Sequence, residues 1–296
     1  MRKYIKNSFF ITIKEENKEN KIIHYNKSIF PAWEIFIKLI FEDLFILKSN
    51  KTIISIEWII KNSNDIIELL LIKNALDEKF GFTDYNSELT LKYLPYSRQD
   101  RVCSSWESFS IKIFANLINN MKFSKIITFD NHSPISSKLI NNIWNYSQLD
   151  LFQKYFKDSI YKFSFLCSPD LGSVNKVSDI SKHYNIPQIT GRKIRNKDWK
   201  IISTEIITNL SKTKNEQNII WKNILIIDDI LDWGSTIVKL VEALKEKKAW
   251  DISVYITHWI FSKGIDYLIK NGIKHIYTTN SFYQWHHKNI SIINES

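Results

Sequence analysis

Three carboxylates lie close together in the segment ILIIDDILDWGSTI, residues 224–237. Four branched apolar residues lead into Asp228 and Asp229, and Asp232 follows three positions later. The apolar run predicts a buried strand at 224–227, so the acids are expected where this strand ends. Carboxylates accept hydrogen bonds from the neighbouring hydroxyls of a sugar, but they repel a phosphate placed directly on them. The acids therefore predict a site for sugar hydroxyls.

Small residues follow the acids, with Gly234, Ser235 and Thr236 standing before a helical pattern of apolar residues. We expect a helix to begin near Ser235, and the free N–H groups of its first turn to bind an anion. These N–H groups and the hydroxyls of Ser235 and Thr236 would form a cradle for a phosphate. Acids for the sugar hydroxyls and a cradle for the phosphate together fit ribose 5-phosphate. The alternative is an acidic cap on the helix dipole, which explains one of the three aspartates but not all of them.

The rest of the chain predicts the elements that position these residues. Five strand-like apolar runs each end in polar residues: LTLKYLP leads into YSRQDR, KIITF into DNHS, FSFLC into SPDLGS, ILII into DDILDWGST, and VYIT into HWIFS. Apolar residues at helical spacing lie between several of these runs, in the sets Ile111, Phe114, Ala115, Ile118 and Ile237, Leu240, Val241, Leu244. Strands that alternate with helices predict a parallel sheet, with ligands beyond the carboxyl ends of its strands.

Length and composition limit the classes of protein. A chain of 296 residues suggests about two domains, and 44% apolar with 24% charged residues is the balance of a folded protein. No run approaches the roughly 18 apolar residues of a membrane helix, and the run 9–13 is too short for a signal peptide. We therefore expect a cytoplasmic protein without a membrane partner. The net charge of +10 suits small phosphorylated substrates, and we expect no nucleic-acid partner because the lysines are scattered without a recognition signature.

The segment DDILDWGST, residues 228–236, resembles the phosphoribosyl pyrophosphate (PRPP) signature shared by type I phosphoribosyltransferases and ribose-phosphate pyrophosphokinases. Further blocks are similar in content, order and spacing to the pyrophosphokinase family, also called PRPP synthetases. These blocks are FPAWE at 30–34, NDIIELLLIKNAL at 64–76, YLPYSRQDR at 93–101, FDNHS at 129–133, SPDLGS at 168–173 and THWIFS at 257–262. The resemblance covers nearly the whole chain.

This resemblance implies a fold and a reaction. The implied fold class is α/β, with two similar domains that each hold a mostly parallel sheet flanked by helices, as in phosphoribosyltransferases. Residues 1–145 would form a domain with ATP-binding elements, and residues 146–296 a phosphoribosyltransferase-like domain with the ribose 5-phosphate site. The implied reaction moves the β,γ-diphosphoryl group of MgATP to the C1 hydroxyl of ribose 5-phosphate, giving PRPP and AMP. The resemblance also implies Mg²⁺ as cofactor and a homo-oligomer, a dimer or larger.

The resemblance assigns residues to roles. The ribose 5-phosphate site would comprise Asp228, Asp229, Asp232, Trp233, Gly234, Ser235 and Thr236. The ATP site would comprise Phe30, Glu34, Arg98, Gln99 and Asp100. Asp170 and Gly172 match the pyrophosphate loop, and His132, Asp170 and Asp130 match positions that hold the magnesium–nucleotide. Lys193 and Arg195, in the basic segment GRKIRNKDWK, match the catalytic pair of a mobile loop.

The chain also departs from the family pattern. Trp233 stands where the family usually has threonine, Ser173 replaces a glycine, and Ala32 replaces an acidic or amide residue that contacts ATP. Two alternatives to an active diphosphokinase therefore stay open: a catalytically silent homologue that binds or regulates a partner, and a type I phosphoribosyltransferase. Each of these site residues also has a purely structural interpretation. It is a surface ion pair for Arg98 and Asp100, a turn residue for His132 and a helix cap for Asp170.

Overall fold

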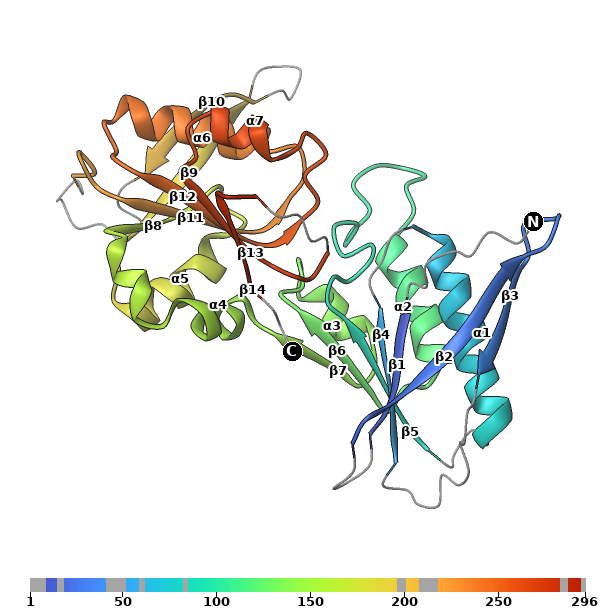
Figure 1. The fold of residues 1–296 in the computed structure, drawn as a ribbon. Coiled ribbons are helices and arrows are strands. Elements are labelled where there is room, and N and C mark those ends of the chain that lie inside the picture. The colour runs from blue at the N-terminus through green and yellow to red at the C-terminus, as the bar shows by residue number, and fades with distance from the viewer. Residues whose placement is uncertain are drawn as a thin grey trace. The chain divides into compact units, whose positions relative to one another are not determined.

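The computed structural model describes residues 9–14, 19–40, 52–58, 62–81, 85–195, 201–207, 218–282 and 287–293. The chain divides into two compact units, Met1–Tyr146 and Ser147–Ser296. Each unit holds a seven-stranded sheet with helices packed on it (Figure 1).

The first unit is built on a sheet with the strand order β3-β2-β1-β4-β5-β6-β7. Strands β4 to β7 run parallel, whereas β1, β2 and β3 extend the sheet with antiparallel pairs. The described strands are β1 Phe9–Lys14, β2 Lys21–Ile29, β3 Ile35–Ile40, β4 Ile53–Trp58, β5 Asn86–Leu91, β6 Lys125–Phe129 and β7 Ile143–Tyr146. The described helices are α1 Asn64–Phe80, α2 Ser110–Asn120 and α3 Ile135–Leu139.

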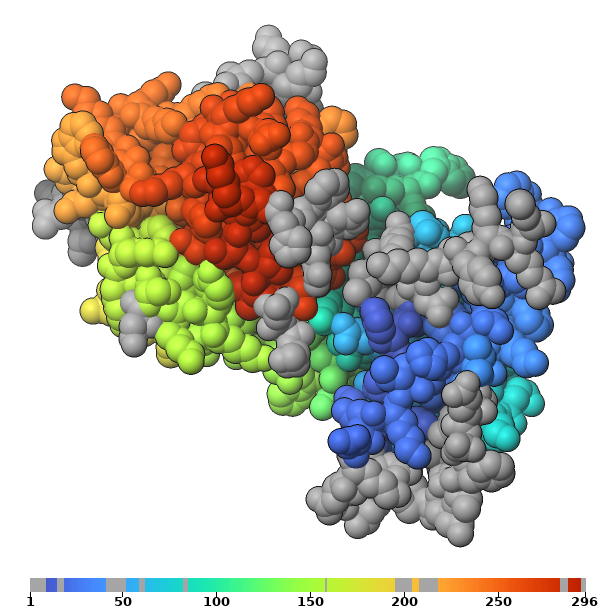
Figure 2. All heavy atoms as spheres, in the orientation of Figure 1, coloured from blue at the N-terminus to red at the C-terminus, as the bar shows by residue number. Residues whose placement is uncertain are grey.

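One apolar core holds the first unit together. The predicted apolar face of α2 is buried, and it shares its core with Leu69 and Ile72 of α1 and with Ile54 and Ile56 of β4. A buried charge joins β2 to α1, because the Glu68 carboxylate, fully buried, accepts hydrogen bonds from the hydroxyl of Tyr25 and the ammonium of Lys27. The side chains of the N-terminal strands, blue in Figure 2, also form part of the surface.

The second unit is built on a sheet with the strand order β10-β9-β8-β11-β12-β13-β14. Only the β9–β10 pair is antiparallel among the described pairs of this sheet. The described strands are β8 Phe165–Ser168, β9 Gln188–Arg195, β10 Ile201–Ile207, β11 Ile224–Leu231, β12 Ile252–Trp259, β13 His275–Thr279 and β14 Ile290–Ile293. The described helices are α4 Gln148–Phe156, the 3-10 helix η1 Lys157–Lys162, α5 Val174–Tyr184, α6 Ser235–Glu246 and α7 Ile265–Lys270.

Helices cover both faces of the second sheet, with α6 and α7 on one side and α4 and α5 on the other (Figure 1). Strand β11 is buried between them, so its side chains alternate between two cores. Ile224 and Ile226 pack with α6, whereas Leu225 and Ile227 pack with α4 and α5. This alternation determines the side to which each following aspartate points.

The predicted fold class is confirmed, since both units are α/β and each sheet contains a run of neighbouring parallel strands. One strand is longer than predicted. Strand β11 continues through the acids to Leu231 because its parallel pairing with β12 extends to the Leu231–Trp259 pair. Strand β9 continues to Arg195 because β10 pairs with it along that length. Within the described residues, no helix has the length and apolarity needed to cross a membrane.

Candidate active site

Asp228 and Asp229, which we call the acid pair, lie near the carboxyl end of β11. Asp228 continues the side of the strand that faces α6, and Asp229 continues the side that faces α4 and α5. The Asp229 side chain is buried, and its backbone N–H donates a hydrogen bond of 3.1 Å to Asp228 Oδ1. Removal from water raises the pKa of Asp228 well above its ordinary range, and the negative charges of Asp229 and Asp170 act in the same direction.

Two side chains from the neighbouring helices hold the acid pair. Lys176, in the first turn of α5, places Nζ 3.0 Å from Asp229 Oδ2. Gln148, the first residue of α4, donates from Nε2 to the carbonyl oxygen of Asp228 at 3.0 Å. Because Lys176 balances the charge of Asp229, the pair can keep at least one ionised carboxylate in a buried position.

The turn that is predicted to cradle a phosphate lies where β11 leads into α6. The helix begins at Ser235, as predicted, and Gly234 caps it with a φ of 72°. A left-handed residue is needed here, and a Cβ atom on Gly234 would lie only 2.7 Å from Leu268 Cδ2. Glycine therefore permits both the turn and its close packing on α7. The first N–H groups of α6 and the hydroxyls of Ser235 and Thr236 stand at this turn, an arrangement suited to a phosphate.

Asp232 and Trp233 form the outer part of the same turn. The hydroxyl of Ser262 donates a hydrogen bond to the Asp232 carboxylate. Trp233 is 61% exposed, so its ring does not fill the turn.

A second loop, between β8 and α5, is organised by Asp170. Its Oδ1 accepts hydrogen bonds from the backbone N–H groups of Gly172 and Ser173 at 2.9 and 3.2 Å. Its Oδ2 lies 2.5 Å from Nζ of Lys193. Burial alone would raise the pKa of Asp170, but the ammonium and the two N–H groups lower it below its ordinary value. Asp170 is therefore an ionised residue that fixes this loop, and the residue at the helix cap is Ser173.

Lys193 and Arg195 lie in strand β9, and the prediction that they belong to a loop is wrong for both. Lys193 is paired with Thr204, and Arg195 with Ile201, in the antiparallel pairing with β10. The basic residues gave no strand signal of their own, because this strand forms by pairing with a segment further along the chain. Of the predicted catalytic segment, residues 196–200 lie outside the described residues.

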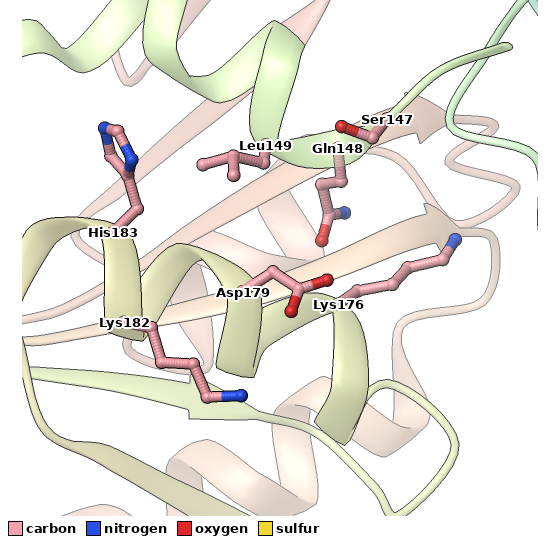
Figure 3. A pocket seen from close by; sticks show the side chains of 7 residues that line it. All are labelled: Ser147, Gln148, Leu149, Lys176, Asp179, Lys182 and His183. Atoms are coloured by element: carbon pink, nitrogen blue, oxygen red, sulfur yellow. The ribbon is translucent and has the colours of Figure 1, made fainter.

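A cavity of about 460 Å³ lies beside the acid pair, lined by Ser147, Gln148, Leu149, Lys176, Asp179, Lys182 and His183. Figure 3 shows the lining residues of α5 on one side and those at the start of α4 on the other. Two of these side chains, Lys176 and Gln148, also contact Asp229 and Asp228. The cavity is thus connected to the acid pair through a single layer of side chains.

The predicted ATP-binding residues lie in two turns of the first unit. Arg98 and Gln99 are exposed after β5, and Asp100 is partly buried with a carboxylate 3.8 Å from Arg101 rather than paired with Arg98 as the alternative proposed. Phe30 and Glu34 close the turn between β2 and β3, where the N–H of Phe30 donates to the carbonyl oxygen of Glu34 at 2.9 Å.

The segment after β6 holds Asp130 and His132. Asp130 is buried with a φ of 41°, and its N–H donates to the carbonyl oxygen of Tyr146 at 2.8 Å. A positive φ is uncommon for a residue with a side chain and marks a constrained turn. His132, two residues later, is exposed.

The metal prediction involves His132, Asp130 and Asp170. Among the described residues, no three His, Cys, Asp or Glu side chains form a group that could hold an ion by themselves. Both oxygens of Asp170 already accept hydrogen bonds from protein groups. Mg²⁺ is commonly bound through one or two carboxylates, several waters and the phosphates of a nucleotide. An Mg²⁺ ion that binds together with a nucleotide therefore needs few ligands from the protein.

Sequence reasoning missed Lys176 and Gln148. Neither belongs to a segment that carries the resemblance, and each reaches the acid pair from a helix distant in sequence. The available signal for Lys176 was its position in the first turn of the helix after SPDLGS, which places a cation close to the strand ends.

Comparison with known proteins first defines the class by its fold. The structure is similar to a crystal structure of phosphoribosylpyrophosphate synthetase from Mycobacterium smegmatis, with a TM-score of 0.75 and 18% sequence identity, covering 93% of this chain and 87% of that one. The chain therefore has the two-unit α/β fold of that class.

Curated relatives then specify the family that the chain resembles. It is 25% identical over 269 residues to a ribose-phosphate pyrophosphokinase of Pyrococcus abyssi, covering 90% of this chain and 87% of the relative. It is 28% identical over 255 residues to one of Mycoplasmopsis pulmonis, covering 83% of this chain and 72% of that relative. No protein-family model matches the chain. The predicted resemblance to ribose-phosphate pyrophosphokinases is confirmed.

Proposed function

We propose that the protein is a ribose-phosphate diphosphokinase, which transfers the β,γ-diphosphoryl group of MgATP to the C1 hydroxyl of ribose 5-phosphate. The products are PRPP and AMP. The observation that supports this most directly is the arrangement of the second unit, where the acid pair, the turn at Gly234 and the Lys193–Asp170 pair lie at the carboxyl ends of neighbouring strands. The relatives, which bear the name of this activity, support the same proposal.

The acid pair and the cradle divide the recognition of the sugar phosphate. Asp228 and Asp229 accept hydrogen bonds from ring hydroxyls, and Lys176 holds Asp229 in place for this contact. The turn from Asp232 to Thr236 binds the 5-phosphate through the N–H groups of α6 and two hydroxyls. This division holds the sugar at both ends, so that its C1 hydroxyl is fixed in one orientation.

Transfer of the diphosphoryl group forms a bond between the C1 oxygen and the β-phosphorus, and it breaks the bond between that phosphorus and the oxygen that leaves with AMP. The C1 hydroxyl loses its proton in the step. Charge increases on the phosphate oxygens, and the ammonium of Lys193 stabilises that charge, with Arg195 proposed for the same role. Asp170 keeps the ammonium in place before the reaction. Mg²⁺, when bound with ATP, would neutralise part of the triphosphate charge.

Nucleotide recognition is proposed for the first unit, through Phe30, Glu34, Arg98, Gln99 and Asp100, with His132 and Asp130 toward the magnesium–nucleotide. The proposal also includes a cytoplasmic location and a homo-oligomer. Small phosphorylated substrates account for the net charge of +10 without a nucleic-acid partner.

Trp233 and Ala32 differ from the residues that the family pattern has at these positions. These differences favour a second candidate, a catalytically silent homologue that binds or regulates a partner. A phosphoribosyltransferase is supported less, since the curated relatives align with both units. The deciding experiment incubates the purified protein with MgATP and ribose 5-phosphate and measures AMP and PRPP by chromatography. Equal amounts of both products are expected, with none when the sugar phosphate is omitted. A folded protein that forms neither product would replace the proposal with the silent homologue.

A further inference from the structure

Residues after β12 and in α7 hold the outer part of the phosphate cradle. Ser262 donates a hydrogen bond to the carboxylate of Asp232, and Leu268 packs against Gly234. Between these contacts, Lys263 places its ammonium 5.6 Å from the centre of the Trp233 ring. Three consecutive cradle residues are therefore each contacted by a residue of one segment, 262–268.

The ammonium of Lys263 is held by two aromatic rings. It lies 4.9 Å from the centre of the Tyr267 ring as well as over Trp233, distances at which the ring faces attract a cation. Within the described part of the chain, Lys263 has no carboxylate in ion-pair contact. The rings thus position a positive charge without neutralising it.

The cradle itself lacks a formal positive charge. Its residues, 232–236, contribute backbone N–H groups, two hydroxyls and the carboxylate of Asp232. A sugar phosphate carries nearly two negative charges at neutral pH. N–H groups and a helix dipole compensate only part of this charge. A cation beside the turn would strengthen the binding of the phosphate, and the Lys263 ammonium lies over the ring of Trp233, a residue of this turn.

We propose that Lys263, positioned by Trp233 and Tyr267, is a specificity-determining residue that recognises the 5-phosphate of the sugar substrate. The inference rests on the proposed function, since it concerns the same cradle. It also explains Trp233: the ring replaces a small hydroxyl residue of the family pattern, and it provides a surface on which the cation is held beside the anion site.

The test measures binding directly, so that it does not depend on turnover. Ribose 5-phosphate and ribose are titrated into the wild type and into Lys263→Met, Lys263→Arg and Lys270→Met by calorimetry, at two salt concentrations. Lys263→Met removes the charge and keeps the length, whereas Lys263→Arg keeps the charge. Lys270→Met is the matched control, because it removes an exposed lysine from the end of α7, the helix that begins two residues after Lys263.

Lys263→Met is expected to weaken ribose 5-phosphate binding by about tenfold or more, which corresponds to about 1.4 kcal/mol. Its binding should also depend less on salt, while ribose binding stays unchanged. Lys263→Arg should stay within about threefold of the wild type, and Lys270→Met should equal it. Wild-type affinity in Lys263→Met, or an equal loss for ribose and ribose 5-phosphate, would overturn the inference.

The outcomes separate this inference from the proposed function. If the wild type binds ribose 5-phosphate in a Lys263-dependent way but forms no AMP, the proposed activity is wrong and the inference stands. If the wild type forms PRPP and Lys263→Met binds the sugar phosphate equally well, only the inference is wrong. If the wild type does not bind ribose 5-phosphate, the inference is overturned directly.

Discussion

Lys193 Nζ lies 2.5 Å from Asp170 Oδ2, and this contact joins strand β9 to the loop before α5. The two residues are 23 positions apart in the chain, and two backbone N–H groups fix the other oxygen of Asp170. The ammonium is therefore positioned by an anchored carboxylate. Its distance from the acid pair is short enough that its charge opposes the rise in the pKa of Asp228.

Replacing Lys193 with alanine should lower kcat for PRPP formation by about a hundredfold or more, comparable to the loss of one preorganised donor. KM for ATP should change little, because the ammonium acts on charge that develops during transfer. Steady-state kinetics with AMP detection measures both values. An undiminished kcat in a folded variant would show that Lys193 is not catalytic.

Arg192→Ala is the matched control for this variant. Arg192 is adjacent in β9, and its guanidinium is paired with Glu205 of β10. It removes a cation from the same strand without touching Asp170. Its kcat should stay within about twofold of the wild type, since exposed ion pairs contribute little.

Lys176→Met should destabilise the protein, because the buried Asp229 carboxylate would lose its ion-pair partner. The expected decrease in the free energy of unfolding is about 2 to 3 kcal/mol, below the value for a fully buried pair because Lys176 is partly exposed. Urea unfolding measures it. Adding Asp229→Asn should restore much of the loss, as it removes the uncompensated charge. Equal stability of Lys176→Met and the double variant would contradict this account.

Asp228→Asn should stabilise the protein at neutral pH while impairing activity. The raised pKa means that native Asp228 keeps a proton that the unfolded chain has released above about pH 4. The contribution of Asp228 to the stability of the wild type is therefore fully present below about pH 4, and it is lost as the pH rises through the native pKa. The variant lacks this loss, so its advantage in stability should be near zero at about pH 4 and should grow as the pH rises toward 7. Thermal unfolding across this range tests the trend, and a constant difference would contradict it.

Gly191→Ala should destabilise β9 through a direct clash. A Cβ atom at Gly191 would lie 2.8 Å from the carbonyl oxygen of Pro169 and 3.0 Å from Leu240 Cδ1. Forcing this contact costs about 1 to 3 kcal/mol in the free energy of unfolding, measured with urea. Gly264→Ala serves as the comparison, since a Cβ atom there meets no atom within 4 Å and its destabilisation comes from the backbone strain of a φ of 78° and not from a clash. Only Gly191→Ala should also lower kcat, because it displaces the strand of Lys193.

Local patterns in the sequence predicted the helices and the turn before α6 well. The apolar faces of α2 and α6 are buried as their spacing indicates, and α6 begins at Ser235 because a glycine and two hydroxyl residues mark that turn. These signals lie within a few residues of the structure that they form. The α/β class followed in the same way from the alternation of strands and helices.

Contacts between distant segments were not predictable from such patterns. Strand β9 extends through the basic residues because β10 pairs with it, and nothing in GRKIR indicates that partner. Lys176 reaches Asp229 across 53 positions of sequence, and Gln148 reaches Asp228 across 80. The roles of the predicted site residues stay predictions until the variants are measured.

Lys193 stands in a strand paired with β10, so its backbone is ordered before any substrate binds. A lysine in an unpaired loop would lose backbone entropy each time the site closes, about 1 to 2 kcal/mol for each residue that becomes fixed. In β9 that entropy is already lost when the chain folds. In the proposed reaction, what remains to be ordered is the torsional freedom of one side chain, and Asp170 has already restricted it.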